Sequence, residues 1–542
     1  MRKLLILLVT LLVVITVMSC GESAPTTTPT STPTSKPTAT APATTTQPAP
    51  STTAKPQPTP TASTPAKKYG GTLRYIIYTA PTAIAGWPAD TGLSSSAAYE
   101  GLVRTQADGT VSPWLAESWE IAQDRSSITF ELRKGVKFTD GTDFNAEAVK
   151  FNFDAQIANK KAPYWSLVEV LNDYAVKVNL TAWRPTTLLQ FGDSSTSGIA
   201  SPTAFKEKGI DWLREHPVGT GAFMFKSFTR DVGQVYIKNP NYWQPGKPYI
   251  DVYDTIVITD DMTTRMAMQA GEGDVTMCEL GKGTIYYKEK GLEIASQIQA
   301  VVCLVPDTAN PDSPWSKKSV REAAEYSIDK AAIAAGLGLG LWEAPYQVPP
   351  RGNAVWNTDF KLGRKYDLEK AKQLMAEAGY PDGFKTTIYP FPGMNRDATL
   401  AVTDALSKIG IIAEVQFVDF GKYFQMNQEG WNNGVMLHPC PAYAIYVETL
   451  NTLFDRDASF FFKKRWERTP AFMEALKVAN STLTQDVPLT RAVTDLMISD
   501  CMVIPVWEGG MSYAYRDYVK DAGFLSRGFS LFWNVEDVWL DK

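Results

Sequence analysis

Residues 113–144 read PWLAESWEIAQDRSSITFELRKGVKFTDGTDF, and this stretch indicates a small antiparallel sheet. From Ser127 to Arg133 apolar and polar residues alternate, which is the period of a strand with one buried face and one wet face. The pairs Lys134-Gly135 and Asp140-Gly141 are typical of hairpin turns. The stretch therefore predicts short strands joined by tight turns.

Helices and a further α/β unit are predicted beyond this sheet. Asn145 can cap a helix whose apolar residues recur four apart and so share one face. Asp367 can cap a second helix and Gly379 can end it, and a strand is predicted from Ile411 to Phe417. A helix, a glycine stop and a strand are typical of an α/β lobe, so we expect an α/β fold.

The N-terminal residues are predicted to be an export signal. Arg2 and Lys3 precede an apolar run that ends near Met18 and is too short for a lasting membrane span. The residues Val17-Met18-Ser19-Cys20 resemble the lipobox of a bacterial lipoprotein. This resemblance implies a signal peptide at 1–19, cleavage before Cys20 and acylation of its thiol. An ordinary cleaved signal with an incidental cysteine is the alternative.

A tether is expected between this signal and the folded body. Residues 21–66 are almost wholly Thr, Pro, Ser and Ala, a composition that cannot bury enough apolar surface to offset its ordering entropy. We therefore expect residues 20–68 to be an acylated, unfolded tether. The body would then be held by its lipid at the outer face of the cell membrane, on the envelope side.

The body, residues 69–542, is longer than one compact core usually holds, so two or three lobes are expected. The whole chain has 58 acidic and 53 basic side chains and no basic stripe, which argues against a nucleic-acid partner. The body has no second long apolar run, so we do not expect it to cross a membrane.

Metal and catalytic sites have little support in the sequence. The two histidines, His216 and His438, stand far apart, and no Cys-x-x-Cys or His-Glu-x-x-His motif occurs, so no metal cage is expected. Neither a Gly-x-Ser-x-Gly elbow nor a Walker A loop is present, and Asp260-Asp261 is best interpreted as solvated. We expect neither cofactor nor enzymatic activity, with a secreted hydrolase as the rival class.

A set of short segments follows a fixed order along the body. They are Pro113–Glu120, Phe130–Phe138, Asp140–Phe144, Pro217–Gly221, Asn239–Trp243, Gly271–Asp274, Val320–Ala324, Ile328-Asp329, Tyr366–Tyr380, Trp533 and Asp537–Trp539. Each segment also has a structural interpretation as a turn, cap or core segment. The ordered set resembles the family 5 extracellular solute-binding proteins, the peptide, nickel-chelate and oligosaccharide receptors of bacterial ABC importers.

The resemblance implies a two-lobed periplasmic-binding-protein-like fold of type II with an extra domain. Lobe one would be discontinuous, and the chain would cross between lobes near residues 302 and 504. The implied parts are lobe one at 69–97, 212–302 and 505–542, the extra domain at 98–211, and lobe two at 303–504. The crossings would form a hinge, and a solute that touches both lobes would stabilise the closed form. The expected partners are a solute and the permease of an importer, with the protein acting as a monomer.

The peptide anchors of such receptors are replaced in this chain. In peptide-binding relatives an acidic residue in a Trp-Cys-Ala-Asp-Tyr-like segment pairs with the free ammonium of the peptide. The matching segment here is His438–Tyr443, in which the acidic position falls on Ala442 and the tryptophan position on Pro439. Because a desolvated ammonium without a carboxylate is costly, we expect that peptides are not anchored in the usual way.

The positions that match the pocket of the family are aromatic or neutral. They are Trp87, Tyr164, Phe420, Asn427, Met436, His438, Tyr443 and Trp507. Aromatic faces with a few polar groups suit sugar rings or an uncharged polar oligomer, so an oligosaccharide or a blocked peptide is the alternative to an ordinary peptide. Relatives that carry nickel as a small chelate use very few protein ligands, and the resemblance makes His438 the candidate for such a contact in this chain.

Four cysteines remain in the body. They are Cys278, Cys303, Cys440 and Cys501. An even number in an oxidising compartment permits at least one disulfide. In some peptide-binding relatives the cysteines at the positions of Cys303 and Cys440 pair, so the resemblance implies that disulfide here. Cys278 and Cys501 would then be buried thiols or a second pair.

Overall fold

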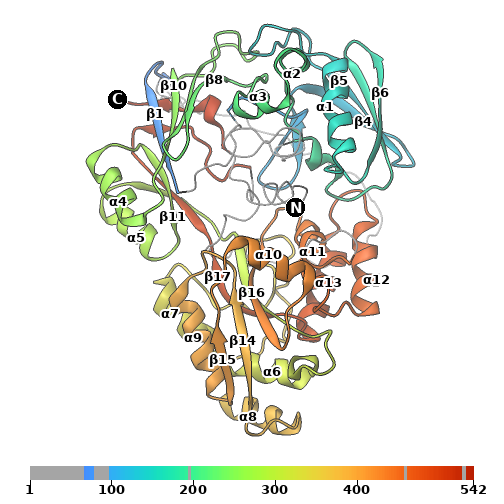
Figure 1. Ribbon diagram of the computed structural model, residues 1–542, viewed down its shortest axis with the longest axis vertical. Helices are drawn as coiled ribbons and strands as arrows, with labels where there is room; N and C mark the ends of the chain where they lie inside the picture. The colour runs from blue at the N-terminus through green and yellow to red at the C-terminus, as the bar shows by residue number, and fades with distance from the viewer. Residues whose placement is uncertain (1–65, 79–96, 193–196, 457–460, 528–532) are drawn as a thin grey trace, which may run out of the picture.

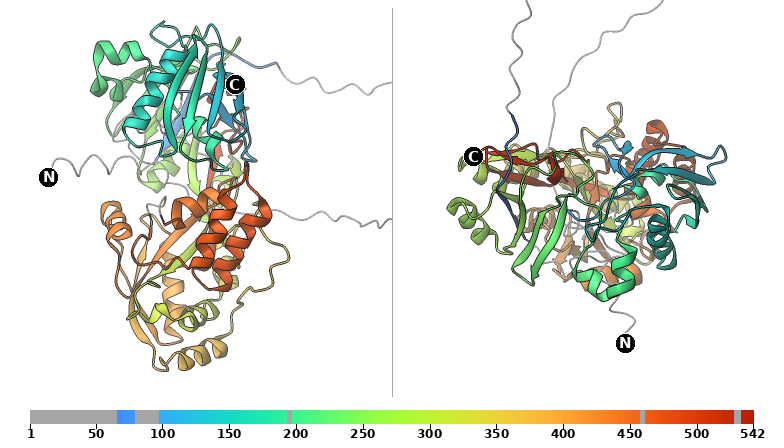
Figure 2. Two further views of the ribbon diagram at one scale, coloured as in Figure 1. Left: turned by 90° about the vertical axis from the view of Figure 1, so that its right-hand side faces the viewer. Right: turned by 90° about the horizontal axis from the view of Figure 1, so that it is seen from above.

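The computed structural model describes residues 66–78, 97–192, 197–456, 461–527 and 533–542. The predicted signal peptide, Cys20, nearly all of the tether and Trp87 lie outside these ranges. Figures 1 and 2 show two bodies stacked along the long axis, with the C-terminus in the upper one. Three sheets organise them, and we use lobe one, extra domain and lobe two for the parts built on each sheet.

Lobe one is built on a seven-stranded sheet in the order β12-β18-β11-β1-β10-β9-β8. Its strands are β1 (Thr72–Ile77), β8 (Phe223–Thr229), β9 (Gly233–Lys238), β10 (Val252–Val257), β11 (Val275–Glu279), β12 (Glu293–Ser296) and β18 (Met511–Tyr515). Helices α4 (Asp261–Ala270) and α5 (Lys282–Glu289) lie beside it, and the C-terminal segment adds β19 (Val519–Lys520), η4 (Val535–Asp537) and β20 (Trp539–Leu540). β1 pairs in parallel with both β10 and β11, and parallel neighbours need a crossover connection. The connection from β1 to β10 contains the extra domain.

The extra domain is built on a four-stranded antiparallel sheet in the order β4-β5-β7-β6. Its elements are β2 (Val103–Thr105), β3 (Val111–Pro113), β4 (Ala116–Ile121), β5 (Ser127–Leu132), α1 (Ala146–Ala158), β6 (Trp165–Asn172), β7 (Ala175–Leu180), η2 (Thr187–Phe191), α2 (Pro202–Lys208) and α3 (Ile210–Glu215). The alternation predicted from Ser127 is confirmed, because Ile128, Phe130 and Leu132 are buried whereas Glu131 is exposed. The side chain of Asn145 accepts a hydrogen bond from the Ala148 amide, so the predicted cap of α1 is also confirmed.

Lobe two is built on a five-stranded sheet in the order β15-β14-β16-β13-β17. Its strands are β13 (Ala300–Pro306), β14 (Phe384–Pro390), β15 (Ile411–Val415), β16 (Gly434–Pro441) and β17 (Ile504–Gly509). Its helices are η3 (Pro314–Ser316), α6 (Lys318–Ser327), α7 (Lys330–Gly338), α8 (Leu368–Glu377), α9 (Arg396–Ser407), α10 (Phe420–Glu429), α11 (Val447–Phe454), α12 (Pro470–Asn480) and α13 (Val487–Ser499). Asp367 caps α8 by accepting from the Lys370 amide, as predicted. The predicted α/β class is confirmed.

Two short links join lobe one to lobe two. The chain leaves the first sheet after β12, enters the second sheet at β13, and returns between β17 and β18. The links are therefore residues 297–299 and Gly510, each a few residues from the predicted crossings near 302 and 504. The Gln299 amide donates to the Gly509 carbonyl, and the Met511 amide donates to the Gln299 side chain at 3.3 Å. The two links are thus adjacent and hydrogen-bonded, as a hinge of two strands requires.

Within the part of the chain that the structure describes, no helix has both the length and the apolar character needed to span a bilayer.

Candidate functional site

Four of the eight predicted solute contacts are buried inside lobe two. Met436 and His438 lie on β16, Trp507 on β17 and Asn427 on α10, and each is at most 3% exposed. All four side chains therefore pack in the interior of the lobe in this conformation. Their role as solute contacts stays a prediction.

The contacts of Asn427 and Trp507 are with other protein groups. The Asn427 side chain donates to the Tyr423 carbonyl at 3.0 Å and accepts from the Phe462 amide at 3.3 Å, so it fixes the segment that follows residue 460. The Trp507 ring stacks on Trp342 with centroids 6.3 Å apart. Both residues hold loops of lobe two against its sheet.

His438 is enclosed by aromatic rings. Its Nδ1 lies 2.8 Å from the Tyr423 hydroxyl, and the ring centroids of Phe391, Phe461 and Phe462 lie 5.4, 4.8 and 5.1 Å from its own. Burial lowers the pKa of His438 to about 3, so the imidazole is neutral at physiological pH. In this conformation His438 is a packing group with one hydrogen-bond partner.

Three predicted contacts keep part of their surface exposed. Tyr164 belongs to the extra domain, whereas Phe420 begins α10 and Tyr443 follows β16 in lobe two. The Arg184 guanidinium lies 5.2 Å from the centroid of the Tyr164 ring, and Asn353 Nδ2 donates to the Tyr443 carbonyl at 3.1 Å. Tyr164 and Tyr443 thus come from different bodies, which is the arrangement a site between the bodies needs.

Cys303 and Cys440, the pair for which the resemblance implies a disulfide, are both buried free thiols in this conformation. The antiparallel register of β13 and β16 places Cys303 opposite His438 and Cys440 opposite Val301, so the two cysteines are diagonal neighbours. The two thiols therefore lie close together on the same face of the lobe-two sheet. Burial raises the pKa of Cys303, and the adjacent Cys440 raises it further. The other two cysteines of the body are also buried free thiols.

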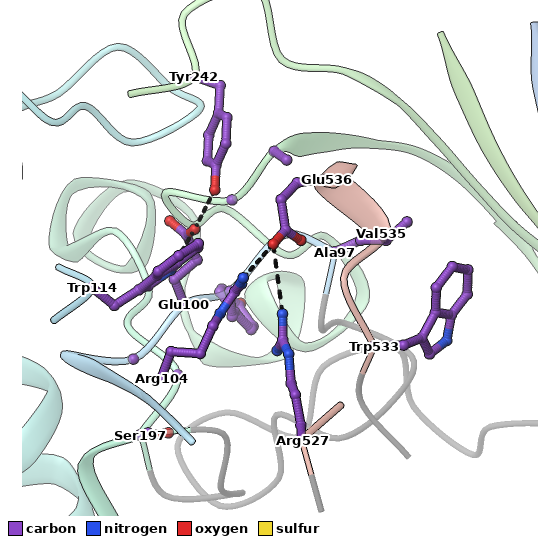
Figure 3. A pocket seen from close by; sticks show the side chains of 16 residues that line it. Ala97, Glu100, Arg104, Trp114, Ser197, Tyr242, Arg527, Trp533, Val535 and Glu536 are labelled. Carbon is purple, nitrogen blue, oxygen red and sulfur yellow. Dashed lines mark hydrogen bonds and ion pairs between the residues drawn. The ribbon is translucent and has the colours of Figure 1, made fainter. Parts of the chain in front are cut away.

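A buried carboxylate joins the extra domain to lobe one (Figure 3). Glu100 Oε1 accepts from Trp114 Nε1 and the Tyr242 hydroxyl, each at 2.8 Å. Glu100 Oε2 accepts from the Thr220 hydroxyl at 2.8 Å and Trp243 Nε1 at 3.0 Å. Burial raises the pKa of Glu100, and the hydrogen bonds that it accepts oppose this rise. Each oxygen therefore holds one indole and one hydroxyl.

A second buried carboxylate, Glu536 in η4, is bound by two arginines (Figure 3). Arg104 Nη1 donates to Glu536 Oε1, and Arg527 Nη2 lies 3.7 Å from the same oxygen. The Arg104 guanidinium also lies 3.3 Å from the centroid of the Trp114 ring. Burial alone would raise the pKa of Glu536, but the charges of the two arginines outweigh it and the pKa is lowered. The C-terminal segment is thereby tied to the extra domain.

A cavity of about 40 Å³ lies between these two carboxylates. Its walls come from the start of the extra domain, from Ser197 and Gly198, from lobe one at Gly221, Ala222 and Tyr242, and from the C-terminal segment. A water molecule needs roughly 10–15 Å³ of such volume, so the cavity has room for a few waters and is too small for an oligomeric solute. We therefore regard the cluster as a structural joint.

The sequence predictions did not include Glu100 or its partners. One signal was available, because Glu100 is a single acidic residue within the apolar run Ala97–Val103 and such a residue is buried only when paired. The partners Tyr242 and Trp243 stand in the segment Asn239–Trp243, for which the sequence offered only a structural interpretation. In the described ranges, no group of three or more His, Cys, Asp or Glu side chains is arranged to hold a metal ion.

Comparison with known proteins places these features in one family. The model of the bacterial extracellular solute-binding proteins, family 5 (middle), matches residues 110–451. Heme-binding protein A of Haemophilus influenzae is 32% identical over 379 residues, which are 62% of this chain and 68% of that protein. Glutathione-binding protein GsiB of Shigella flexneri serotype 5b is 29% identical over 333 residues, which are 60% of this chain and 64% of that protein. The chain thus spans about two thirds of the length of these relatives.

Solved structures show the same fold. The periplasmic binding protein DppA of Helicobacter pylori, in complex with the peptide STSA, has a TM-score of 0.73 at 22% identity and covers 88% of this chain and 99% of its own. NikA of Brucella suis, in complex with Fe(III)-EDTA, has a TM-score of 0.73 at 20% identity and covers 87% of this chain and 100% of its own. The predicted two-lobed periplasmic-binding-protein-like fold is therefore confirmed.

Proposed function

The chain belongs to family 5 of the bacterial extracellular solute-binding proteins, and from this premise we propose that it captures a peptide-like or other oligomeric solute. The solute would lie between lobe two and the upper body, which consists of lobe one and the extra domain. Members of this family bind solutes for ABC importers and are not enzymes. The observation that carries the proposal is the pair of adjacent links at 297–299 and Gly510, since they allow one body to rotate against the other.

The chemical class of the solute has to be inferred from the residues of this chain, because its relatives are named for different ligands. Ala442 offers no carboxylate to a free ammonium, and it lies beside the part-exposed Tyr443. Tyr164 supplies an aromatic face from the extra domain. These groups support a solute whose amino terminus is blocked, or an uncharged polar oligomer such as an oligosaccharide, as the alternative to a free peptide.

Native mass spectrometry of the protein as isolated, followed by calorimetry, tests the solute class. We expect di- to pentapeptides with free and acetylated amino termini to bind equally well or equally poorly. The variant Ala442→Asp should gain a preference for the free terminus, since it restores a carboxylate at the matching position. Sub-micromolar binding by the wild-type protein that depends on a free amino terminus would overturn the blocked-solute proposal, and turnover of the solute would overturn the receptor itself.

The lipid anchor is a separate part of the proposal. It is supported by Val17-Met18-Ser19-Cys20, and it would hold the receptor, as a monomer, near the permease on the outer face of the membrane. Metabolic labelling with palmitate should mark the wild-type protein and should not mark Cys20→Ala. Equal labelling of the two proteins would contradict acylation at Cys20.

A further inference from the structure

The extra domain touches lobe two on the side away from the two links (Figure 1). Arg125 Nη1 donates to the Ser481 carbonyl at 2.7 Å, and Trp183 Nε1 donates to the Leu483 carbonyl at 2.9 Å. Both carbonyls belong to the turn between α12 and α13. Two separate parts of the extra domain therefore bind the same turn of lobe two, and neither bond involves the hinge.

A charged contact lies beside these bonds. Glu448 on α11 accepts a hydrogen bond from Thr186 of the extra domain and lies close enough to Arg184 for their charges to interact. The hydroxyl of Thr452 on α11 donates to the same carboxylate at 3.5 Å, and Tyr443 is the other titratable side chain that senses Glu448. Arg184 is the residue whose guanidinium faces the Tyr164 ring, so this contact adjoins a predicted solute contact.

Apolar surfaces close the rest of the interface. Leu189 of η2 packs against the hydrophobic core of lobe two, although it belongs to the extra domain. Gly109, at the tip of the β2–β3 turn, has φ +81°, and a Cβ atom there would lie 2.8 Å from Ile445 Cδ1 and 3.1 Å from Ala444 Cβ. The turn therefore fits against lobe two with no room for a methyl group.

We propose that the extra domain closes on lobe two when the protein closes, and that the contacts between the two domains form a latch. The latch consists of Gly109, Arg125 and residues 183–189 on the extra domain, and of residues 444–448 and 481–483 on lobe two. It rests on the proposed function, since a latch opposite the hinge has a role only in a protein that opens and closes around a solute. Because each net hydrogen bond contributes modestly, the latch can form and break repeatedly.

The variant Gly109→Ala tests the latch, and Gly141→Ala is its matched control. Gly141 lies in another turn of the extra domain with φ +87°, so alanine is similarly strained there, but a Cβ atom at this position has no neighbour within 4 Å. Fluorescent labels on Leu171→Cys in β6 and Val478→Cys in α12 report the separation of the extra domain from lobe two, and both sites are accessible to labelling because they are exposed, at 52% and 39%. The four native cysteines of the body are buried and stay unlabelled.

We expect Gly109→Ala to reduce the population with the short label distance about tenfold or more, the scale that overpacking produces, and Gly141→Ala to retain it. Trp183→Phe, which removes only the indole donor, should reduce it less and guards against misfolding of the glycine variant. Equal distance distributions for Gly109→Ala and Gly141→Ala, with an unchanged Trp183→Phe, would overturn the latch.

Measuring the co-purified solute on the same samples separates the latch from the receptor function. If the wild-type protein captures a solute while Gly109→Ala stays as closed as its control, the latch fails and the receptor stands. If Gly109→Ala opens the protein while the wild-type protein captures no solute, the latch stands and the receptor function fails.

Discussion

Replacing Glu100 by glutamine should weaken the joint between the extra domain and lobe one, although the two side chains have nearly the same shape. Each carboxylate oxygen accepts one indole N–H and one hydroxyl. Glutamine has one carbonyl oxygen, and its NH₂ group would face an indole N–H that can only donate. The hydroxyl of Tyr242 or Thr220 can turn and accept, but the indole of Trp114 or Trp243 cannot.

The expected loss follows from this single orphaned donor. A buried donor without an acceptor costs about 1–3 kcal/mol. Part of this cost is offset, because burial raises the pKa of Glu100 and glutamine does not carry the desolvation penalty of the charge. We expect Glu100→Gln to lower the free energy of unfolding of the upper body by about 1–2 kcal/mol. Glu100→Ala orphans both indoles and leaves a cavity, so it should cost about 3–5 kcal/mol.

Urea denaturation followed by tryptophan fluorescence measures this loss. Glu117→Gln is the matched control, because the Glu117 side chain on β4 is 56% exposed and its replacement should change stability by less than about 0.5 kcal/mol. In combination with Glu100→Gln, either Trp114→Phe or Trp243→Phe should cost less than the sum of the single changes, since it removes the orphaned donor. Unfolding of Glu100→Gln at the same urea concentration as the wild-type protein, or at a higher one, would refute the reasoning.

Three further predictions concern titration and thiols. The native pKa of His438 is about 3, below its ordinary 6.5, so the unfolded chain binds the proton first and up to about 4–5 kcal/mol of stability should be lost as pH falls from 6.5 to 3. His438→Phe should flatten this part of a pH series of urea melts. Iodoacetamide should alkylate Cys303 and Cys440 only once the protein is unfolded, and no reductant should then be needed. A peptide cross-linked through these two cysteines in a non-reducing map would contradict this. Burial in the latch raises the pKa of Glu448 above its ordinary 4.5, so protonation favours closure. The closed fraction measured by the labels should rise as pH falls from 7 toward 4.5, and should not respond to pH in Glu448→Gln; a wild-type fraction that falls over this range would show that the sign is wrong.

Elements with a strong local signal were predictable from the sequence. The alternation from Ser127 to Leu132 predicts a strand, because successive side chains of a strand point to opposite faces and here one face is buried. The caps at Asn145 and Asp367 were predictable because the capping side chain and the backbone amide that it binds are only three residues apart in the sequence. The order of the motifs then indicated the family and, through it, the arrangement of lobes.

The candidate site was harder to predict because burial depends on partners that are distant in sequence. The pairing of β16 with β13 places Cys303 opposite His438, and α10 brings Tyr423 onto the His438 ring. No sequence pattern around residue 438 predicts that the His438 side chain will be covered by other side chains. The same applies to Glu100, since its four donors come from positions 14 to 143 residues away.

The two faces of the extra domain differ in strength, and this difference decides where the protein opens. Toward lobe one, Glu100 and Glu536 are buried and hold several donors, so separation would leave charged groups without partners at a cost of several kcal/mol. Toward lobe two, Arg125 and Trp183 donate to exposed carbonyls, and each such bond contributes about 1 kcal/mol or less. The extra domain must therefore move together with lobe one. Opening then separates it from lobe two about the links at 297–299 and Gly510, and a solute has only to supply the small difference that keeps the latch closed.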